Sequence, residues 1–386
     1  MSGVVATVLP VANLSWDELG ALALARQFPD RGDAVDPVDV ADAVRRTGPI
    51  QSQAARSPFV GLAARFPGVT HEEITRAYED FRIVRGSTIR GTVHTTVPEH
   101  HPLLEMATRQ GQRSHWVRTL KIDDGLVDDL WASIEDLARQ EWRTPAELLD
   151  HVREFALDHG GTWPAALDGG TGRYLGFGHG GLVRRPLRGG WDGQGAPGYR
   201  TAAALLGDRD DTLRDPHALD ALFVVHLGAH GPASRHDLAW WAGQRLGAVD
   251  ESLERLGLTS VSGPDGRQYV DLPDAPPPRA PAGVRLLAEY DALFCAYDPP
   301  ARARFVTKEH NDRLWLSANG MVKPPILVDG RLTGHWRAGG SAKKRPLEVS
   351  YFPGTRRPRK SELEQPVAAL EAALGIAITS VSIARA

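Results

Sequence analysis

The sequence has one cysteine, three methionines and no long hydrophobic run. The single thiol, Cys295, excludes an intramolecular disulfide and a cysteine cluster for zinc or iron–sulfur, and an unpaired thiol is typical of a reducing compartment. The N-terminal residues lack the basic start and apolar core of a signal peptide. No stretch approaches the roughly 18 apolar residues that a transmembrane helix needs. We therefore expect a soluble, cytoplasmic protein without a membrane partner.

Charge of one sign does not dominate either, because 45 Lys and Arg stand against 48 Asp and Glu. The composition as a whole therefore does not indicate a nucleic-acid partner. Two segments are locally basic: residues 82–121 and residues 341–360 each carry seven Lys or Arg, against two acidic residues and one, respectively. Such runs are usually solvated surface, but separated basic stripes can also form a groove that binds phosphates.

Several catalytic signatures are missing from the sequence. A P-loop, a G-x-S-x-G elbow and an H-E-x-x-H pair are all absent, so these nucleotide, serine-hydrolase and zinc chemistries are not indicated. The spacing G-x-G-x-x-G occurs at Gly176, Gly178 and Gly181, but strand-like LVRRPL follows it, so we expect a turn. We expect no metal and no cofactor. A paired-carboxylate mechanism stays open, because spacing alone selects no pair among many acidic residues.

Helical patterns recur along the chain, each time followed by short strands. Ser15 and Glu18 form a capping box before the first helix, and residues 83–97 switch to the two-residue period of a strand pair. Residues 49–66 contain Pro58 and predict two helical pieces with a break. Three tryptophans are expected to pack in the core, namely Trp240, Trp241 and Trp336.

The repeated order predicts an α+β fold of tandem winged helix-turn-helix units followed by a small β-barrel-like domain. We expect the first three units at residues 14–122, 123–210 and 211–273. The proline-rich stretch DAPPPRAP is the clearest linker. The barrel-like domain, with a C-terminal helix, is expected at residues 282–386.

Four segments together resemble the winged-helix family of bacterial DNA glycosylases typified by AlkZ and YcaQ. They are GPIQSQAARSPFVGLAARF, STIRGTVHTTVPEH, GPASRHDLAWWAGQ and ILVDGRLTGHWR, in the order that the family uses. The resemblance implies winged-helix units around a basic channel for duplex DNA and excision of purines alkylated at N7. Some members remove bulky natural-product adducts or unhook interstrand crosslinks.

The family's catalytic motif, Q-x-Q or Q-x-D, falls on Gln51 and Gln53. The double-glutamine form is the one seen in members tied to antibiotic self-resistance in actinomycetes. An N7-alkylguanine is cationic and leaves as a neutral base, so the enzyme must orient water and stabilise charge on the sugar. Glutamines at i and i+2 do not share a helical face, but at a helix start both could point into one channel. No lysine is singled out as a Schiff-base nucleophile, so we expect a monofunctional glycosylase.

Six further residues are candidates for contact with double-stranded DNA. Arg90 and His94 lie on the expected first wing, and Arg56 and Ser57 follow the glutamines. Asn319 and Lys323 belong to the hairpin that the resemblance implicates. Each also has an ordinary structural interpretation, as a surface charge or a satisfied polar group. We expect the protein to act as a monomer.

Two other hypotheses stay open at this point. Winged helices most often bind DNA without changing it, so a non-catalytic binder or transcription regulator is the alternative function. A chain of this fold that has lost or changed its activity is the third.

Overall fold

The computed structural model describes residues 13–30, 38–121, 123–159, 170–207, 210–316, 320–340 and 343–386. The first helix, α1 (Trp16–Gln27), begins at the expected capping box. The Ser15 hydroxyl accepts a hydrogen bond from the Glu18 backbone N–H at 3.3 Å, and the Glu18 carboxylate accepts one from the Ser15 N–H at 2.7 Å. This reciprocal pair satisfies two N–H groups that a helix start otherwise leaves unbonded.

Three more helices precede the first strand pair: α2 (Val40–Thr47), α3 (Ser57–Arg65) and α4 (His71–Glu79). The predicted strand pair is confirmed as β2 (Val84–Thr88) and β3 (Thr92–Thr96), joined by the 3₁₀ turn Ile89–Gly91. The helix start expected at Gln51 and Gln53 is wrong. Ile50 and Gln51 form a short strand, β1, and the next helix begins only at Ser57. Antiparallel pairing of β1 with β3 explains this difference, since that strand supplies backbone partners that no local pattern reveals.

Strands from the first two expected units form one five-stranded sheet in the order β1-β3-β2-β4-β5. The strands β4 (Leu182–Pro186) and β5 (Pro197–Thr201) follow helices α5–α8, and β4 contacts β2. These helices are α5 (His101–Leu120), α6 (Asp124–Leu137), α7 (Pro145–Asp158) and α8 (Gly170–Phe177). The G-x-G-x-x-G spacing lies where α8 ends and the chain turns into β4, so the predicted turn is confirmed.

The next segment holds a second group of helices. After the short helices α9 (Ala202–Leu206) and α10 (Asp210–Arg214) come α11 (Ala218–His230), α12 (Arg235–Ala242) and α13 (Leu246–Leu256). A three-stranded sheet of β6 (Ala233–Ser234), β7 (Ser260–Ser262) and β8 (Gln268–Val270) completes it.

The C-terminal part is a curved half-barrel sheet in the order β15-β14-β13-β12-β9. Its strands are β9 (Val284–Leu286), β12 (Pro325–Val328), β13 (Arg331–Ala338), β14 (Lys344–Tyr351) and β15 (Ala377–Arg385). Helices α14 (Ala292–Cys295) and α15 (Lys308–Leu314) and the hairpin β10 (Trp315–Leu316) and β11 (Met321–Val322) lie between β9 and β12, and α16 (Glu364–Leu374) precedes β15.

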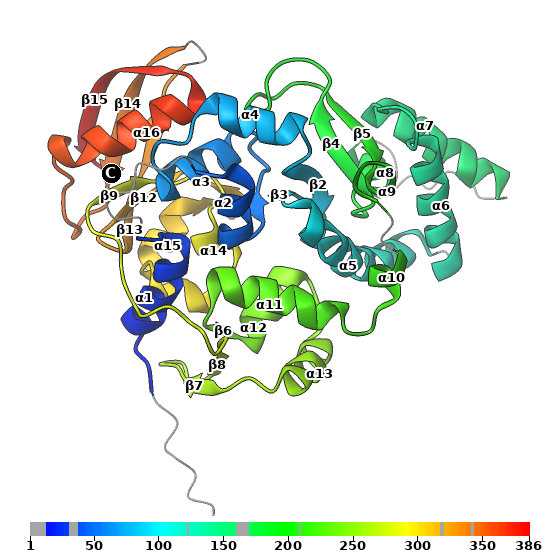
Figure 1. Ribbon diagram of the computed structural model, residues 1–386, viewed down its shortest axis with the longest axis horizontal. Coiled ribbons are helices and arrows are strands. Elements are labelled where there is room, and N and C mark those ends of the chain that lie inside the picture. The colour runs from blue at the N-terminus through cyan, green and yellow to red at the C-terminus, as the bar shows by residue number, and fades with distance from the viewer. Residues whose placement is uncertain are drawn as a thin grey trace, which may run out of the picture.

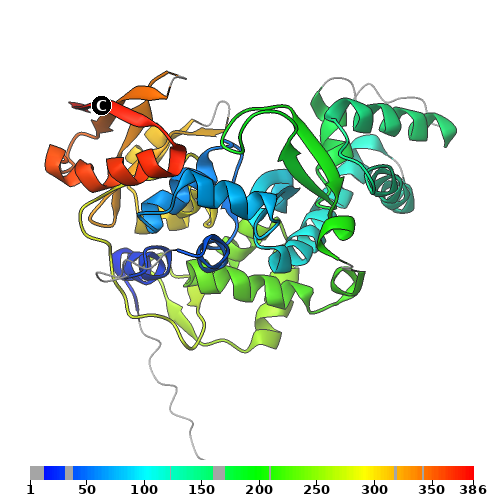
Figure 2. The same ribbon diagram turned by 45° about the horizontal axis from the view of Figure 1, so that its top comes forward.

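The half-barrel shares its core with the first helices. Trp336 is fully buried, as predicted, in a cluster that joins Phe59 of α3 to Leu370 of α16. Trp241 is buried too, whereas Trp240 is partly exposed. Helices α6–α8 lie at one end of the molecule and the half-barrel at the other, with α3 between them (Figures 1 and 2). In the part of the chain that the structure describes, no helix is both long and apolar enough to cross a membrane.

Candidate active site

Gln51 and Gln53 lie at the edge of the five-stranded sheet. Gln51 pairs directly with His94 of β3, and opposite residues of an antiparallel pair point to the same face. The Ser52 N–H donates to the Val93 carbonyl at 2.7 Å, which continues the pairing one residue past the end of β1. The backbone then bends at Gln53, and both glutamines contact the β2–β3 hairpin.

Both glutamine amides have their carbonyl oxygens bound within the protein. Gln51 Oε1 lies 3.5 Å from Arg90 Nη2, and Gln53 Oε1 lies 3.4 Å from the Val93 backbone nitrogen. A guanidinium and a backbone N–H only donate, so each contact identifies the oxygen end of its amide. Both hydrogen bonds are long. Gln51 is buried and Gln53 is exposed.

Arg90 is held in a left-handed backbone conformation (φ 60°) within the turn between β2 and β3. Its guanidinium donates to the Trp241 carbonyl and lies 5.8 Å from the centre of the Trp240 ring. Arg302 approaches the same Trp240 ring at 5.6 Å and lies 4.2 Å from the Trp315 ring. A chain of contacts thus connects Gln51 to Trp315, the first residue of the β10–β11 hairpin.

Burial controls the charge of these groups. It lowers the pKa of Arg90, and it lowers the pKa of Arg302 to about 10, so Arg302 remains cationic at neutral pH. Burial also lowers the pKa of His94 to about 3, with the Arg90 charge as the second cause. His94 Nδ1 lies 3.0 Å from the Thr92 carbonyl, which can only accept, so the neutral ring carries its proton there. His94 is therefore neutral at physiological pH.

Arg56 and Ser57 contact the segment that follows β9. Arg56 forms an ion pair with Glu289, with its Nε 3.0 Å from Glu289 Oε1. The Ser57 side chain is wholly buried, and its hydroxyl donates to the Glu289 backbone carbonyl at 3.0 Å. In this structure both side chains therefore tie α3 to the half-barrel, and the Ser57 hydroxyl faces the protein rather than solvent.

The two hairpin candidates are placed differently. Asn319 lies outside the described residues. Lys323 directly follows β11, and its backbone N–H donates to the Leu314 carbonyl at 3.0 Å. Burial is the main cause that lowers the pKa of His335, and the charge of Lys323 is the second cause. On the hairpin, Leu316 and Met321 pair with each other and are both exposed.

A small cavity of about 20 Å³, enough for roughly one water molecule, lies beside Gln51. Its lining includes Arg65, Glu289, Tyr290 and Asp291. The sequence analysis predicted none of these four residues as part of the site. It also predicted that Trp240 packs in the core, whereas Trp240 is partly exposed. The stretch AEYDALF carries no motif, and only the packing of α14 against β1 makes these residues neighbours of Gln51.

The described residues contain no group of three or more His, Cys, Asp or Glu side chains placed to hold a metal ion. The chemistry that the site offers is that of amides, guanidinium groups and carboxylates.

Comparison with known proteins identifies the class. A family model described as DNA glycosylase AlkZ-like matches residues 44–373, which is most of the chain. The chain belongs to this family and is a DNA glycosylase, a DNA-binding enzyme of DNA repair. The alternative of a non-catalytic regulator is thereby set aside.

A solved structure, the DNA glycosylase AlkZ of Streptomyces sahachiroi, has the same fold. It superposes with a TM-score of 0.77 over 96% of this chain and 100% of its own, at 21% sequence identity. No curated protein matches the sequence.

Proposed function

We propose that this DNA glycosylase hydrolyses the N-glycosidic bond of N7-alkylated purines in double-stranded DNA, with Gln51 and Gln53 as its catalytic pair. The main observation in support is the arrangement of the Gln51 and Gln53 side-chain amides. Both contact the β2–β3 hairpin, and each carbonyl oxygen is bound by a donor that cannot accept. A site prepared in this way needs little rearrangement when substrate binds.

The substrate's own charge explains why amides suffice at this position. In an N7-alkylguanine the base is cationic, so it leaves as a neutral molecule without an acid to protonate it. The enzyme then has to position a water molecule and stabilise the positive charge that develops on the deoxyribose. The Gln51 and Gln53 amides can do both through their dipoles and hydrogen bonds. One well-placed dipole of this kind is worth about 3–4 kcal/mol in the transition state.

DNA engagement is proposed to involve Arg90, Lys323 and Asn319, acting on one DNA duplex with the protein as a monomer. Arg90 supports this through its position: it contacts Gln51 and is only partly buried. Arg56, Ser57 and His94 are weaker candidates, because the first two contact Glu289 and His94 is almost fully buried. The four-unit division of the chain also stays a prediction. Bulky natural-product adducts and interstrand crosslinks are proposed as substrates on the resemblance of the Q-x-Q motif alone, as is a role in antibiotic self-resistance.

The test measures excision from two duplexes, one carrying N7-methylguanine and one a bulky N7-guanine adduct. Abasic sites are converted to strand breaks by mild base. Gln51→Ala and Gln53→Ala are each expected to lower the single-turnover rate about 10²–10³-fold. Gln110→Ala, at an exposed amide on α5, is the matched control and should keep the wild-type rate. Equal rates in all four proteins would contradict the assignment of the pair.

A second readout tests the monofunctional mechanism. Borohydride is added during excision, which would trap a Schiff base between a lysine and the sugar. We expect no covalent protein–DNA adduct, and a robust adduct would refute hydrolysis by water.

A further inference from the structure

We propose that Glu289 is the catalytic base that accepts the proton of the attacking water, a role that rests on the proposed function of Gln51 and Gln53. The two amides leave one chemical requirement unmet, namely a group that accepts the proton of the attacking water. A glutamine side chain can orient water, but it has no useful basicity, so it cannot take the proton that water must lose.

Glu289 is fixed close to the catalytic pair by the segment that follows that pair in sequence. Arg56, three residues after Gln53, binds Glu289 Oε1 through both Nε and Nη2. Ser57 holds the Glu289 backbone carbonyl at 3.0 Å. Glu289 is therefore held by the start of α3, although it lies more than 200 residues away in sequence, and only 14% of its side chain is exposed.

The other carboxylate oxygen is the unusual feature. Glu289 Oε2 is buried and has no hydrogen-bond partner among the described residues. Buried polar atoms are nearly always hydrogen-bonded, and leaving a charged oxygen without a donor is costly. Glu289 lines the same cavity as Gln51, so a turn of the carboxylate would place this oxygen beside a water molecule at the Gln51 amide.

A second carboxylate in the cavity provides a contrast. Asp291 binds Arg65 with both oxygens, at 2.9 Å each, and Oδ1 also accepts from the Leu293 N–H. Asp291 is thus saturated by structural contacts, whereas Glu289 uses only one oxygen in this way. Between them, Tyr290 adopts a left-handed backbone conformation (φ 59°). Strain of this kind is often retained at functional sites.

In the proposed step, water replaces the alkylated base at C1′ of the deoxyribose. A lone pair of the water oxygen forms the bond to C1′ of the deoxyribose, and the C1′–N9 bond breaks with its electron pair moving into the base. That pair neutralises the positive charge of the N7-alkylated ring, so the base leaves uncharged. One water proton goes to Glu289 Oε2 and is later released to solvent. The products are an abasic site with a C1′ hydroxyl group and the free alkylated base.

The test compares Glu289→Gln and Glu289→Asp with the wild type in single-turnover excision of N7-methylguanine at pH 7. We expect Glu289→Gln to lower the saturating rate about 10²–10⁴-fold, with the dissociation constant for lesion DNA unchanged within about threefold. Glu289→Asp should keep part of the rate. The charged or titratable groups in the same cavity lining are Arg65, Tyr290 and Asp291, with Arg56 on the carboxylate itself.

The rate and the affinity together separate a base from a structural anchor. Loss of a base lowers the saturating rate and leaves the dissociation constant for lesion DNA unchanged, whereas loss of an anchor that only shapes the binding surface weakens DNA binding. Glu348→Gln, which removes an exposed partner of Arg337, is the matched control and should behave as wild type.

Two results would overturn the proposal: a Glu289→Gln rate equal to wild type, or weaker DNA binding with an unchanged saturating rate. If Glu289→Gln does not fold, Glu289→Asp is used instead, and a wild-type rate would again refute the proposal, because the shorter side chain cannot reach the same water molecule. Failure of the proposed function is distinguishable, since it would appear as no N7-methylguanine excision by the wild type.

Discussion

At the scale of single residues, burial sets the protonation of the histidines. Burial lowers the pKa of His226 to about 4, as it lowers that of His94 to about 3. In the unfolded chain both titrate near 6.5. Between these values the unfolded state binds a proton that the folded state does not, so the free energy of unfolding falls as the pH is lowered through this range.

His226→Gln isolates one of these contributions. The amide can still donate to the Ala296 carbonyl, which His226 Nε2 approaches at 3.0 Å, but it does not titrate. From pH 7 to pH 5 we expect the free energy of unfolding to fall by about 2 kcal/mol less in the variant than in the wild type. Denaturant titrations at both pH values measure this difference. His115→Gln, at an exposed histidine, should show the wild-type pH dependence.

At the scale of elements, the β10–β11 hairpin is connected to the active site by aromatic and guanidinium groups. Arg302 lies between Trp315 and Trp240, and Trp240 contacts Arg90, which binds Gln51. Replacing Arg302 by Met removes the cation and keeps a flexible apolar chain. We expect excision of N7-methylguanine to slow about 5–30-fold, because each cation–π contact contributes about 1–2 kcal/mol when desolvated.

The same variant should also lose stability. Arg302 is almost fully buried, and its Nε donates to the buried Phe294 carbonyl at 3.0 Å, which loses that donor when Met replaces Arg. Chemical denaturation should place the variant about 1–3 kcal/mol below wild type, so excision is measured where both proteins are fully folded. Arg185→Met, which disrupts similar contacts with Trp142 and Trp191 away from the hairpin, serves as the control for excision. A loss of rate in that control as large as in Arg302→Met would show that the effect is not specific to the hairpin connection.

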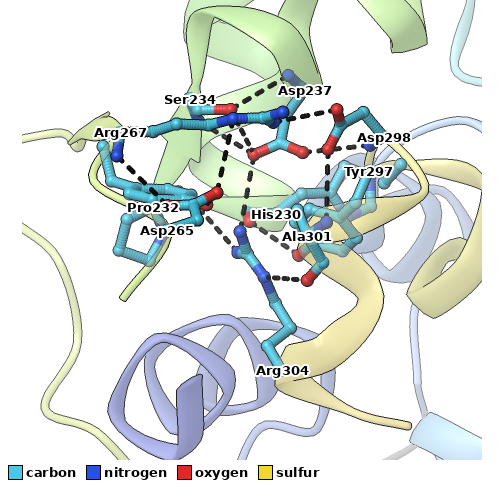
Figure 3. A network of polar contacts seen from close by, with 12 residues as sticks. His230, Pro232, Ser234, Asp237, Asp265, Arg267, Tyr297, Asp298, Ala301 and Arg304 are labelled. Atoms are coloured by element: carbon cyan, nitrogen blue, oxygen red, sulfur yellow. Dashed lines mark hydrogen bonds and ion pairs between the residues drawn. The ribbon is translucent and has the colours of Figure 1, made fainter. Parts of the chain in front are cut away.

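At the scale of the whole molecule, a buried ionic network joins α12 to the turn at Pro300–Arg304 (Figure 3). Arg304 donates to the Pro232 carbonyl at 2.8 Å and lies 3.4 Å from the Asp237 carboxylate. Asp237 also accepts from the Asp298 N–H at 3.0 Å. Burial raises the pKa of Asp237, while the Arg304 charge opposes this.

Arg304→Met would leave the Asp237 carboxylate buried without its cation. We expect a loss of about 3–5 kcal/mol in the free energy of unfolding, measured by denaturant titration at pH 7. Adding Asp237→Asn should recover part of the loss, because the uncompensated charge is then gone. Arg313→Met, which breaks an exposed pair with Glu309, should change stability by less than about 1 kcal/mol. A similarly small effect of Arg304→Met would mean that the network contributes little.

The predicted elements were those whose signals are local. The capping box at Ser15, the strand pair after α4 and the turn after α8 depend on neighbours within a few residues, and all are confirmed. The strand at Gln51 was missed, because its hydrogen bonds go to β3, more than 40 residues away. The candidate site follows the same division: the Gln51 and Gln53 positions came from a motif, whereas Glu289 had no local signal.

The sequence by itself determined the α+β class, the helix caps, the hairpin turns and the position of the glutamine motif, because capping, turn chemistry and hydrophobic period act between near neighbours. Only the tertiary structure decided that Arg56 binds Glu289, that Arg90 orients Gln51 and that His94 is neutral. Contact and burial between distant segments set those properties, and no local pattern encodes the low-dielectric surroundings that shift a pKa or leave a carboxylate oxygen without a partner.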